Sequence, residues 1–173
     1  RSFYNYLYNN GFVKKNYFVN IKNPKKEKGI PKFVKDVDID KMFSIPDLRN
    51  PLGQRNLLII RMLYATGIRV SELINIKMED INGNDITIVG KGSKRRMVHV
   101  NEKTMQYITV YLSTRKGGVD NLFVSNGNSP MLPNSINRTL KRLAKKAGIE
   151  KNIHNHSLRH LWATCMLDNN VPI

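Results

Sequence analysis

An almost continuously apolar segment, residues 57–65, is the feature that most restricts how this chain can fold. A helix on a domain surface carries a polar face, whereas a helix that is apolar nearly all round is buried at the centre of a domain. Gly67 follows this segment and is well suited to end a helix in the left-handed conformation. We therefore expect a central helix that ends at Gly67.

Shorter segments with apolar residues at helical spacing lie on both sides of this central segment. The predicted helices run from Asp36 or Asp38 through Met42 and Phe43, over residues 70–76, through Met105, Ile108 and Leu112, from Pro133 to Gly148, and along a stripe of Leu158, Leu161, Trp162, Cys165 and Met166. Alternating residues at 86–88 and 97–100 predict a β-hairpin, and residues 122–124 predict a third strand. The predicted class is α+β, mainly helical, with helices packed around a small antiparallel sheet.

Composition divides the chain into three parts. Residues 1–19 carry aromatic residues at four-residue spacing and predict a short helix. Residues 20–35 contain two prolines, a glycine and several lysines, which is typical of a linker. Residues 36–173 hold the predicted main domain. Because the chain begins with Arg1 and ends soon after a predicted helix, we expect it to be an excerpt of a longer protein whose main domain is incomplete at its C-terminus.

The chain is strongly basic, with 29 Lys and Arg against 13 Asp and Glu and a formal charge of +16. Such an excess favours a polyanionic partner, because each phosphate that is neutralised releases condensed counterions. Nucleic acid is the leading candidate for this partner, and an acidic membrane surface is the second. The third alternative is a basic soluble protein that binds no polyanion. The one cysteine, Cys165, excludes an internal disulfide and suits a reducing compartment. The sequence contains neither a membrane-length apolar run nor a secretory signal.

Arg69 directly follows the glycine turn at the end of the predicted central helix. A guanidinium held at such a place presents a rigid fork of donors that suits phosphate oxygens. The alternative is a surface arginine paired with Glu72, three residues later.

A second candidate is the predicted hairpin turn at residues 90–96, which has four cations in seven positions. Its glycines allow close approach to another chain, and Lys91 is expected at the exposed tip. The segment lacks the spacing and context of a nucleotide-binding phosphate loop. A solvated basic turn is the alternative.

His156 and Arg159 form a third candidate, because three residues apart on a helix they share a face. We expect this face to lie opposite the apolar stripe. Imidazole can bind a phosphate oxygen or transfer a proton near neutral pH, and arginine neutralises charge beside it. A zinc site using His156 and His160 is disfavoured, since no Glu lies between them, Cys165 belongs to the stripe, and Arg159 would repel a cation.

Together these segments resemble the tyrosine recombinase (phage integrase) family, in particular its Xer-type and simple integrase branch. The matching pieces are residues 66–73, residues 90–96 and residues 156–160 leading into Ala163 and Thr164. The resemblance implies the catalytic-domain fold of that family for residues 36–173. Residues 1–19 would be the last helix of its N-terminal, DNA-clamping domain, and residues 20–35 its interdomain linker.

The resemblance also implies roles for individual residues. The catalytic residues would be Arg69, Lys91, His156 and Arg159, with Lys94 as a substitute for Lys91. The two arginines would clamp the scissile phosphate, Lys91 would protonate the leaving 5′-oxygen, and His156 would assist proton transfer. No metal or nucleotide cofactor is implied. The expected DNA contacts are Lys94, Arg95, Arg96, Arg138, Lys141, Arg142 and His160. Lys145 and Lys146 lie on the same predicted helix as Arg138, Lys141 and Arg142.

One departure from the family is that all seven tyrosines precede His156, whereas the family places its nucleophilic tyrosine later. We therefore expect the nucleophile to lie outside this chain, in a removed segment or in a neighbouring subunit. The implied partners are double-stranded DNA and a homotetramer on paired sites, with no membrane, in the cytoplasm and at the nucleoid. The alternatives are a non-catalytic DNA-binding protein, a type IB topoisomerase-like enzyme and, as an outsider, a zinc-dependent hydrolase.

Overall fold

The computed structural model describes residues 2–18, 20 and 34–169, and of Lys91 it describes the backbone alone. The chain divides into two compact units, residues 1–31 and residues 32–173. The linker expected at residues 20–35 lies almost wholly outside the described residues, as does the end of the chain after Asn169. Among the described residues, no helix has both the length and the apolar character that a bilayer span requires.

The first unit contains one helix, α1 (Ser2–Asn9), followed by turns. The prediction of a helix over residues 1–19 is therefore wrong beyond Asn9. Gly11 has a φ of 73°, and the Asn10 amide bonds back to the Tyr6 carbonyl, so the chain turns where the predicted helix would continue.

The second unit is built from six α-helices, two 3₁₀ turns and three short strands among its described residues. Its elements are α2 (Asp36–Phe43), α3 (Pro51–Thr66), α4 (Val70–Asn75), η1 (Met78–Asp80), β1 (Ile81–Asn82), β2 (Asp85–Val89), η2 (Lys91–Ser93), β3 (Arg95–His99), α5 (Glu102–Thr114), α6 (Pro133–Lys146) and α7 (Asn155–Asp168). The mainly helical α+β class is thus confirmed.

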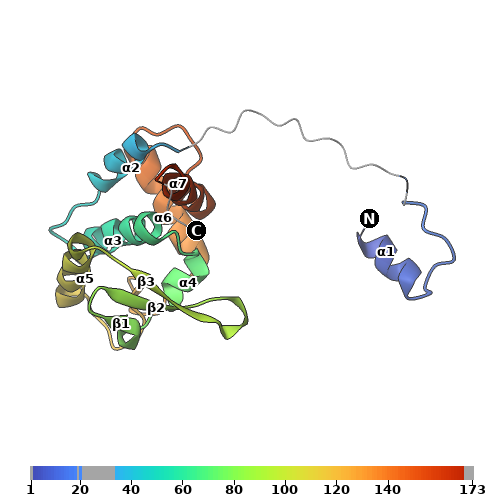
Figure 1. Cartoon of the computed structure of the whole chain (residues 1–173), viewed down its shortest axis with the longest axis horizontal. Coiled ribbons are helices and arrows are strands. Elements are labelled where there is room, and N and C mark those ends of the chain that lie inside the picture. Colours follow the sequence, from blue (N-terminus) through green and yellow to red (C-terminus); the bar gives the residue numbers. More distant parts are fainter. Residues whose placement is uncertain (1, 19, 21–33, 170–173) are drawn as a thin grey trace. The chain divides into compact units, whose positions relative to one another are not determined.

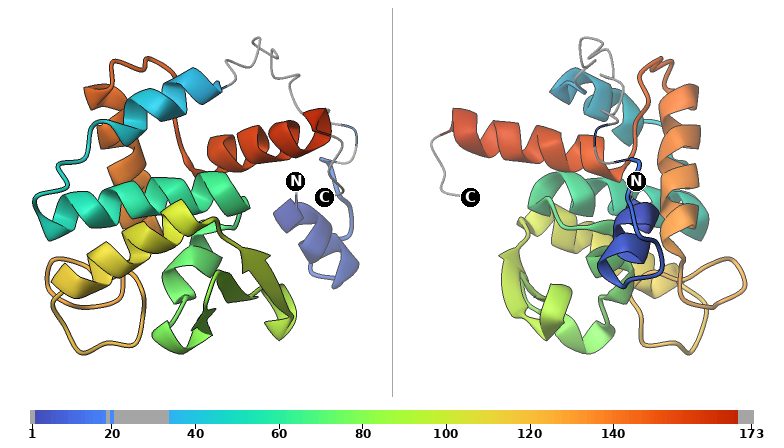
Figure 2. Two further views of the ribbon diagram at one scale, coloured as in Figure 1. Left: turned by 60° about the vertical axis from the view of Figure 1, so that its left-hand side comes forward. Right: turned by 90° about the vertical axis from the view of Figure 1, so that its right-hand side faces the viewer.

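Helix α3 is the centre of the second unit, as its apolar sequence predicts. Leu58, Ile59 and Ile60 are fully buried, and the helix contacts α2, α4, α5, α6 and α7. In Figures 1 and 2 it lies between the small sheet on one side and helices α2 and α7 on the other. It begins after Asn50, whose side chain accepts a hydrogen bond from the Gly53 amide, and it ends at Gly67 with a φ of 59°.

The sheet is antiparallel with strand order β1-β2-β3. Ile86 pairs with Val98 and Ile88 with Arg96, which confirms the predicted hairpin. The third strand differs from the prediction, because β1 takes this place and residues 122–124 form no strand. These three residues are instead buried core in irregular backbone, with isolated bridges at the neighbouring Asn121 and at Val124. A short apolar run shows burial, but alone it does not distinguish a strand from a buried loop.

Candidate active site

Arg69 occupies the N-cap position of α4, two residues after the glycine that ends α3. Its backbone amide donates to Glu72 Oε2 at 2.8 Å, and its Nη1 donates to Glu72 Oε1 at 3.0 Å. The Arg69 side chain is nevertheless 56% exposed. The pairing with Glu72 therefore coexists with an accessible guanidinium, which keeps donors available for a ligand.

Glu72 connects Arg69 to the sheet. Its side chain is only 3% exposed, and its two oxygens also accept from Arg96 on β3 at 3.1 and 2.8 Å. Burial by itself raises the pKa of this carboxyl, but the hydrogen bonds from Arg96 and Arg69 outweigh burial and lower the pKa to about 2. Glu72 is thus ionised at neutral pH and fixes both arginines.

Arg159 on α7 reaches the same place from the other end of the chain. Its Nη1 donates to the backbone carbonyl of Gly67, two residues before Arg69. Trp162, one turn further along α7, packs so closely on Gly67 that an added Cβ would lie 2.4 Å from its ring. The expectation that the Arg159 face lies opposite the apolar stripe is therefore wrong for Trp162, which lies on the Arg159 side of the helix. Glycine at position 67 is what allows both approaches.

The backbone of Lys91 begins the turn between β2 and β3. The Gly90 amide donates to the Lys94 carbonyl at 2.8 Å and closes this turn, and Gly92 and Ser93 have positive φ values of 74° and 58°. A Cβ at Gly90 would lie 3.4 Å from Arg96 Nη1 and 3.5 Å from Glu72 Oε1. Gly90 therefore lies beside the ion pair between Glu72 and Arg96. Because Glu72 also pairs with Arg69, this contact connects the turn to Arg69.

His156 lies in the first turn of α7, three residues before Arg159, and its side chain is exposed. Its ring stands 6.0 Å, centroid to centroid, from the ring of His154. His154 caps the helix, because its Nδ1 accepts from the Ser157 amide. Burial lowers the pKa of His154, and the nearby His156, Lys141 and His160 lower it further. Lys141 therefore contributes positive charge beside His154, which suits an anion.

The predicted DNA-contacting residues divide between two regions. Lys94, Arg95 and Arg96 are on the hairpin, and Arg96 uses two of its nitrogens to bind Glu72. Arg138 and Lys141 on α6 line a cavity with both His154 and His156. Two further predicted contacts lie outside this cavity: Arg142, which lines a different cavity, and His160, which is exposed on α7.

Two participants were not among the sequence-predicted site residues. Glu72 was considered only as an alternative partner of Arg69, although its i,i+3 spacing was the available signal. His154 precedes the predicted helix, and only the capping geometry reveals its place. Among the described residues, no group of three or more His, Cys, Asp and Glu side chains converges as metal ligands would.

The three tyrosines of the second unit have structural contacts. Tyr64 donates to Asp36 Oδ1 at 2.9 Å, and burial together with this bond raises its pKa to about 12. Tyr107 stacks on the Arg61 guanidinium, and Tyr111 is 2% exposed. None of the three is among the residues that surround Arg69 and Arg159.

The chain is similar to known proteins along its whole length. The model of the phage integrase family matches residues 32–173. The tyrosine recombinase XerC of Bacillus licheniformis is 33% identical over the whole chain, and the tyrosine recombinase XerD of Listeria monocytogenes is 32% identical. The chain spans 60% and 61% of the length of these two relatives.

Solved structures show the same fold. The crystal structure of the XerA recombinase superposes with a TM-score of 0.73 at 28% identity, over 95% of this chain and 58% of that one. The XerH recombinase, solved with its difH substrate before cleavage, gives a TM-score of 0.69 at 26% identity, over 90% of this chain and 47% of that one. With its family model matched over nearly all of the second unit, this chain belongs to the phage integrase family, the tyrosine recombinases.

Proposed function

We propose that the chain is the catalytic part of a site-specific DNA recombinase that exchanges strands through a 3′-phosphotyrosyl intermediate. One observation carries the proposal: Arg159 donates to the carbonyl of Gly67, two residues before Arg69, although 92 positions separate the bonded residues in sequence. Two guanidinium groups whose anchor points lie two residues apart would together bind the two non-bridging oxygens of one phosphodiester.

Arg69 and Arg159 would act on the phosphorus centre. Charge accumulates on the non-bridging oxygens as the fifth oxygen approaches, and donors already held in place stabilise that charge without reorganising. Glu72 would serve as a positioning residue, since it fixes Arg69 by two hydrogen bonds and is ionised at neutral pH.

Lys91 and His156 would act in proton transfer. Lys91 would protonate the leaving 5′-oxygen, with Lys94 on the same turn as a substitute, and His156 would assist transfer at the attacking side. The covalent intermediate would preserve the energy of the phosphodiester for rejoining, so the reaction needs no nucleotide.

The nucleophile would be a tyrosine outside these 173 residues, in a longer form of the chain or in a neighbouring subunit. Tyr64 and Tyr111 are held by hydrogen bonds within the second unit, and Tyr107 stacks on an arginine. A tyrosine with a pKa raised to about 12, as in Tyr64, is also a poor source of phenolate.

The remaining basic residues would hold the DNA backbone. These are Lys94, Arg95, Arg96, Arg138, Lys141, Arg142 and His160. The XerH structure is a complex with a difH substrate, and by analogy double-stranded DNA is the proposed partner here. A tetramer on paired sites, a DNA-clamping role for residues 1–19 and an interdomain linker at residues 20–35 complete the proposal.

The test is trapping of the intermediate. A form extended through its downstream reading frame is incubated with a suicide duplex, which carries a nick that lets the 5′-fragment diffuse away. We expect a protein–DNA adduct that survives SDS, and we expect Arg159→Lys to reduce its rate by about 10²-fold. Arg49→Lys is the matched control, because it makes the same change at an exposed arginine that has no part in the proposed site or in the proposed DNA contacts.

Normal DNA binding without any adduct would overturn the proposal in favour of a non-catalytic DNA-binding protein. An adduct that forms on DNA lacking a specific sequence and relaxes supercoils would instead indicate a type IB topoisomerase-like enzyme.

A further inference from the structure

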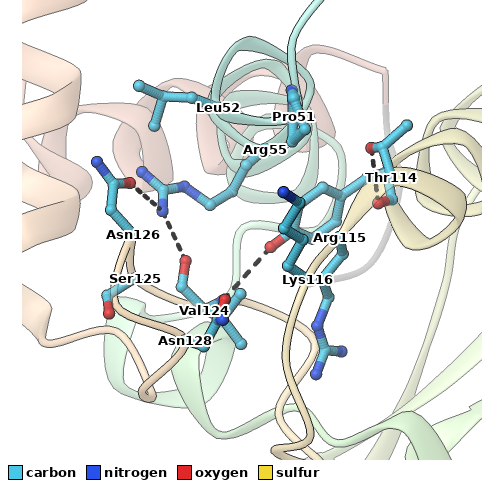
Figure 3. A pocket seen from close by; sticks show the side chains of 11 residues that line it. Pro51, Leu52, Arg55, Thr114, Arg115, Lys116, Val124, Ser125, Asn126 and Asn128 are labelled. Atoms are coloured by element: carbon cyan, nitrogen blue, oxygen red, sulfur yellow. Dashed lines mark hydrogen bonds between the residues drawn. The ribbon is translucent and has the colours of Figure 1, made fainter.

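A second group of cationic side chains lies near the start of α3, centred on Arg55, which alone among them is buried. Arg55 is 8% exposed, and its Nη1 donates to the Val124 carbonyl at 2.6 Å and to Asn126 Oδ1 at 3.4 Å. Figure 3 shows its guanidinium between these two groups. Both partners are neutral, so the charge is solvated by dipoles alone.

Arg55 lacks a counter-charge within the described part of the chain. No carboxylate there lies within ion-pair distance of it, and its Nε is buried with no hydrogen-bond partner. Burial is the main reason why the pKa of Arg55 is lowered; the nearby Tyr111 acts in the opposite direction, and Arg142 adds a smaller lowering. Removing a charge from water without pairing is costly, so this arrangement favours an anion that completes the pairing.

Two cavities adjoin Arg55, and their described linings contain no acidic residue. One, of about 290 Å³, also has Arg138 and Arg142 of α6 in its wall. The other, of about 270 Å³, has Arg115 and Lys116. Leu52, Ser125 and Asn126 line both. The hydroxyl and amide groups add neutral donors, and guanidinium groups bind phosphate oxygens with two parallel hydrogen bonds.

We infer that the cavity between Arg55, Arg138 and Arg142 is a phosphate-binding subsite, separate from the pair Arg69 and Arg159. Arg55 would be its fixed anchor, and the two arginines of α6 would close on the ligand from the solvent side.

The position of Arg138 bears on the source of the phosphate. Arg138 lines this cavity and also the cavity that contains His156. A DNA strand whose scissile phosphate is near His156 would therefore find its next cationic position at Arg138 and then at Arg55. This source rests on the proposed function, whereas a free phosphate or phosphomonoester would use the same chemistry without it.

The first arm of the test measures inorganic phosphate. Titration calorimetry and thermal unfolding of the 173-residue protein are compared in sodium phosphate and in sodium chloride of equal ionic strength. Arg142→Gln removes one exposed guanidinium from the cavity and should weaken phosphate binding about tenfold or more while leaving the melting temperature in chloride unchanged. Lys103→Gln is the matched control, since it removes one exposed charge from α5, outside this cavity.

Arg55→Met is the second variant, and it should abolish phosphate binding. Because this change also frees the Val124 carbonyl, circular dichroism in chloride first establishes that the variant is folded. If it unfolds, Arg142→Gln and Arg138→Gln carry the test alone.

The second arm measures duplex DNA by fluorescence anisotropy with the same proteins. Weaker DNA binding in Arg142→Gln than in Lys103→Gln, with no phosphate-specific effect, identifies a backbone phosphate as the ligand. A phosphate effect without a DNA effect identifies a free phosphate. Equal behaviour of all cavity variants and the control in both arms overturns the inference. Failure of adduct trapping leaves the phosphate arm intact, so the two proposals fail independently.

Discussion

At position 72 a single carboxylate, 3% exposed, accepts hydrogen bonds from two arginines on different elements. A carboxylate in such surroundings would be unfavourable without partners, because burial penalises its charged form. With Arg69 and Arg96 donating to both oxygens the balance reverses, and the pKa falls to about 2 from an ordinary value of 4.5. The pairing therefore stabilises the folded state wherever Glu72 is ionised.

The variant Glu72→Gln tests this at the scale of one residue. We expect the free energy of unfolding at pH 7 to fall by about 2 kcal/mol, since an amide cannot replace a carboxylate between two cations. A group with a depressed folded pKa contributes its full stabilisation above its unfolded pKa and loses it as the pH falls through its folded pKa. The difference between wild type and variant should thus be constant above pH 4.5 and should shrink towards pH 2.

Urea denaturation of both proteins across this pH range provides the measurement. Glu79→Gln is a suitable control, because Glu79 is 74% exposed and pairs with Lys77 at the surface. A difference that stays constant down to pH 2 would show that Glu72 is not paired as described.

At the scale of elements, the end of α3 meets α7 at Gly67. The left-handed conformation of this glycine follows from its position after an apolar helix, so the sequence predicts it. The approach of Trp162 and the hydrogen bond from Arg159 do not follow from any local pattern, because they join segments far apart in sequence.

The substitution Gly67→Ala tests both the left-handed backbone conformation at this position and the close approach of Trp162. A left-handed alanine costs about 1 kcal/mol, and the clash of its Cβ with Trp162 adds about 2 kcal/mol more. Gly83→Ala is the matched control: Gly83 has a φ of 57°, close to the 59° of Gly67, but nothing within 4 Å of its Cβ position. Chemical denaturation should therefore show a clearly larger loss at position 67, and equal losses would exclude the close approach of Trp162.

The elements that local patterns predicted well are those with a strong period. The central helix, the hairpin and the helix that starts at Pro133 all keep their apolar spacing over several turns or residue pairs. The two errors concern short or mixed segments. Residues 122–124 are apolar because they are buried, and of the three only Val124 pairs, in an isolated bridge. The aromatic spacing at residues 1–19 is interrupted by the turn at Gly11.

The candidate site was predictable to the same extent. The sequence motifs indicate Arg69 and Arg159 as candidates. The hydrogen bond from Arg159 to the Gly67 carbonyl, which brings the two segments together, depends on tertiary packing and could not be predicted. Arg55 is the opposite case, since an arginine among the polar residues that begin a helix carries no signal until its burial is known.

For the whole molecule, the charge of +16 predicts a steep dependence of DNA binding on salt. If six or more phosphates are neutralised, the affinity should fall by about 10³-fold between 50 and 200 mM salt. The double variant Arg138→Gln/Lys141→Gln should reduce the slope of log K against log salt by about 2, because each contact contributes about 1.

Anisotropy titrations at several salt concentrations provide the measurement, and Lys103→Gln/Lys116→Gln gives a control with the same loss of charge. If both double variants change the slope equally, net charge and not the surface of α6 determines binding.

The common anchorage of Arg69 and Arg159 has a consequence for motion. Residues 67 and 69 are joined by two peptide units, which span at most about 7 Å. Fluctuations of the 90–96 turn can therefore move Lys91, the proposed proton donor, without separating the two anchor points. In the proposed mechanism, a phosphate bound between the arginines would keep its place while Lys91 moves, so that substrate binding and proton transfer would be physically separable.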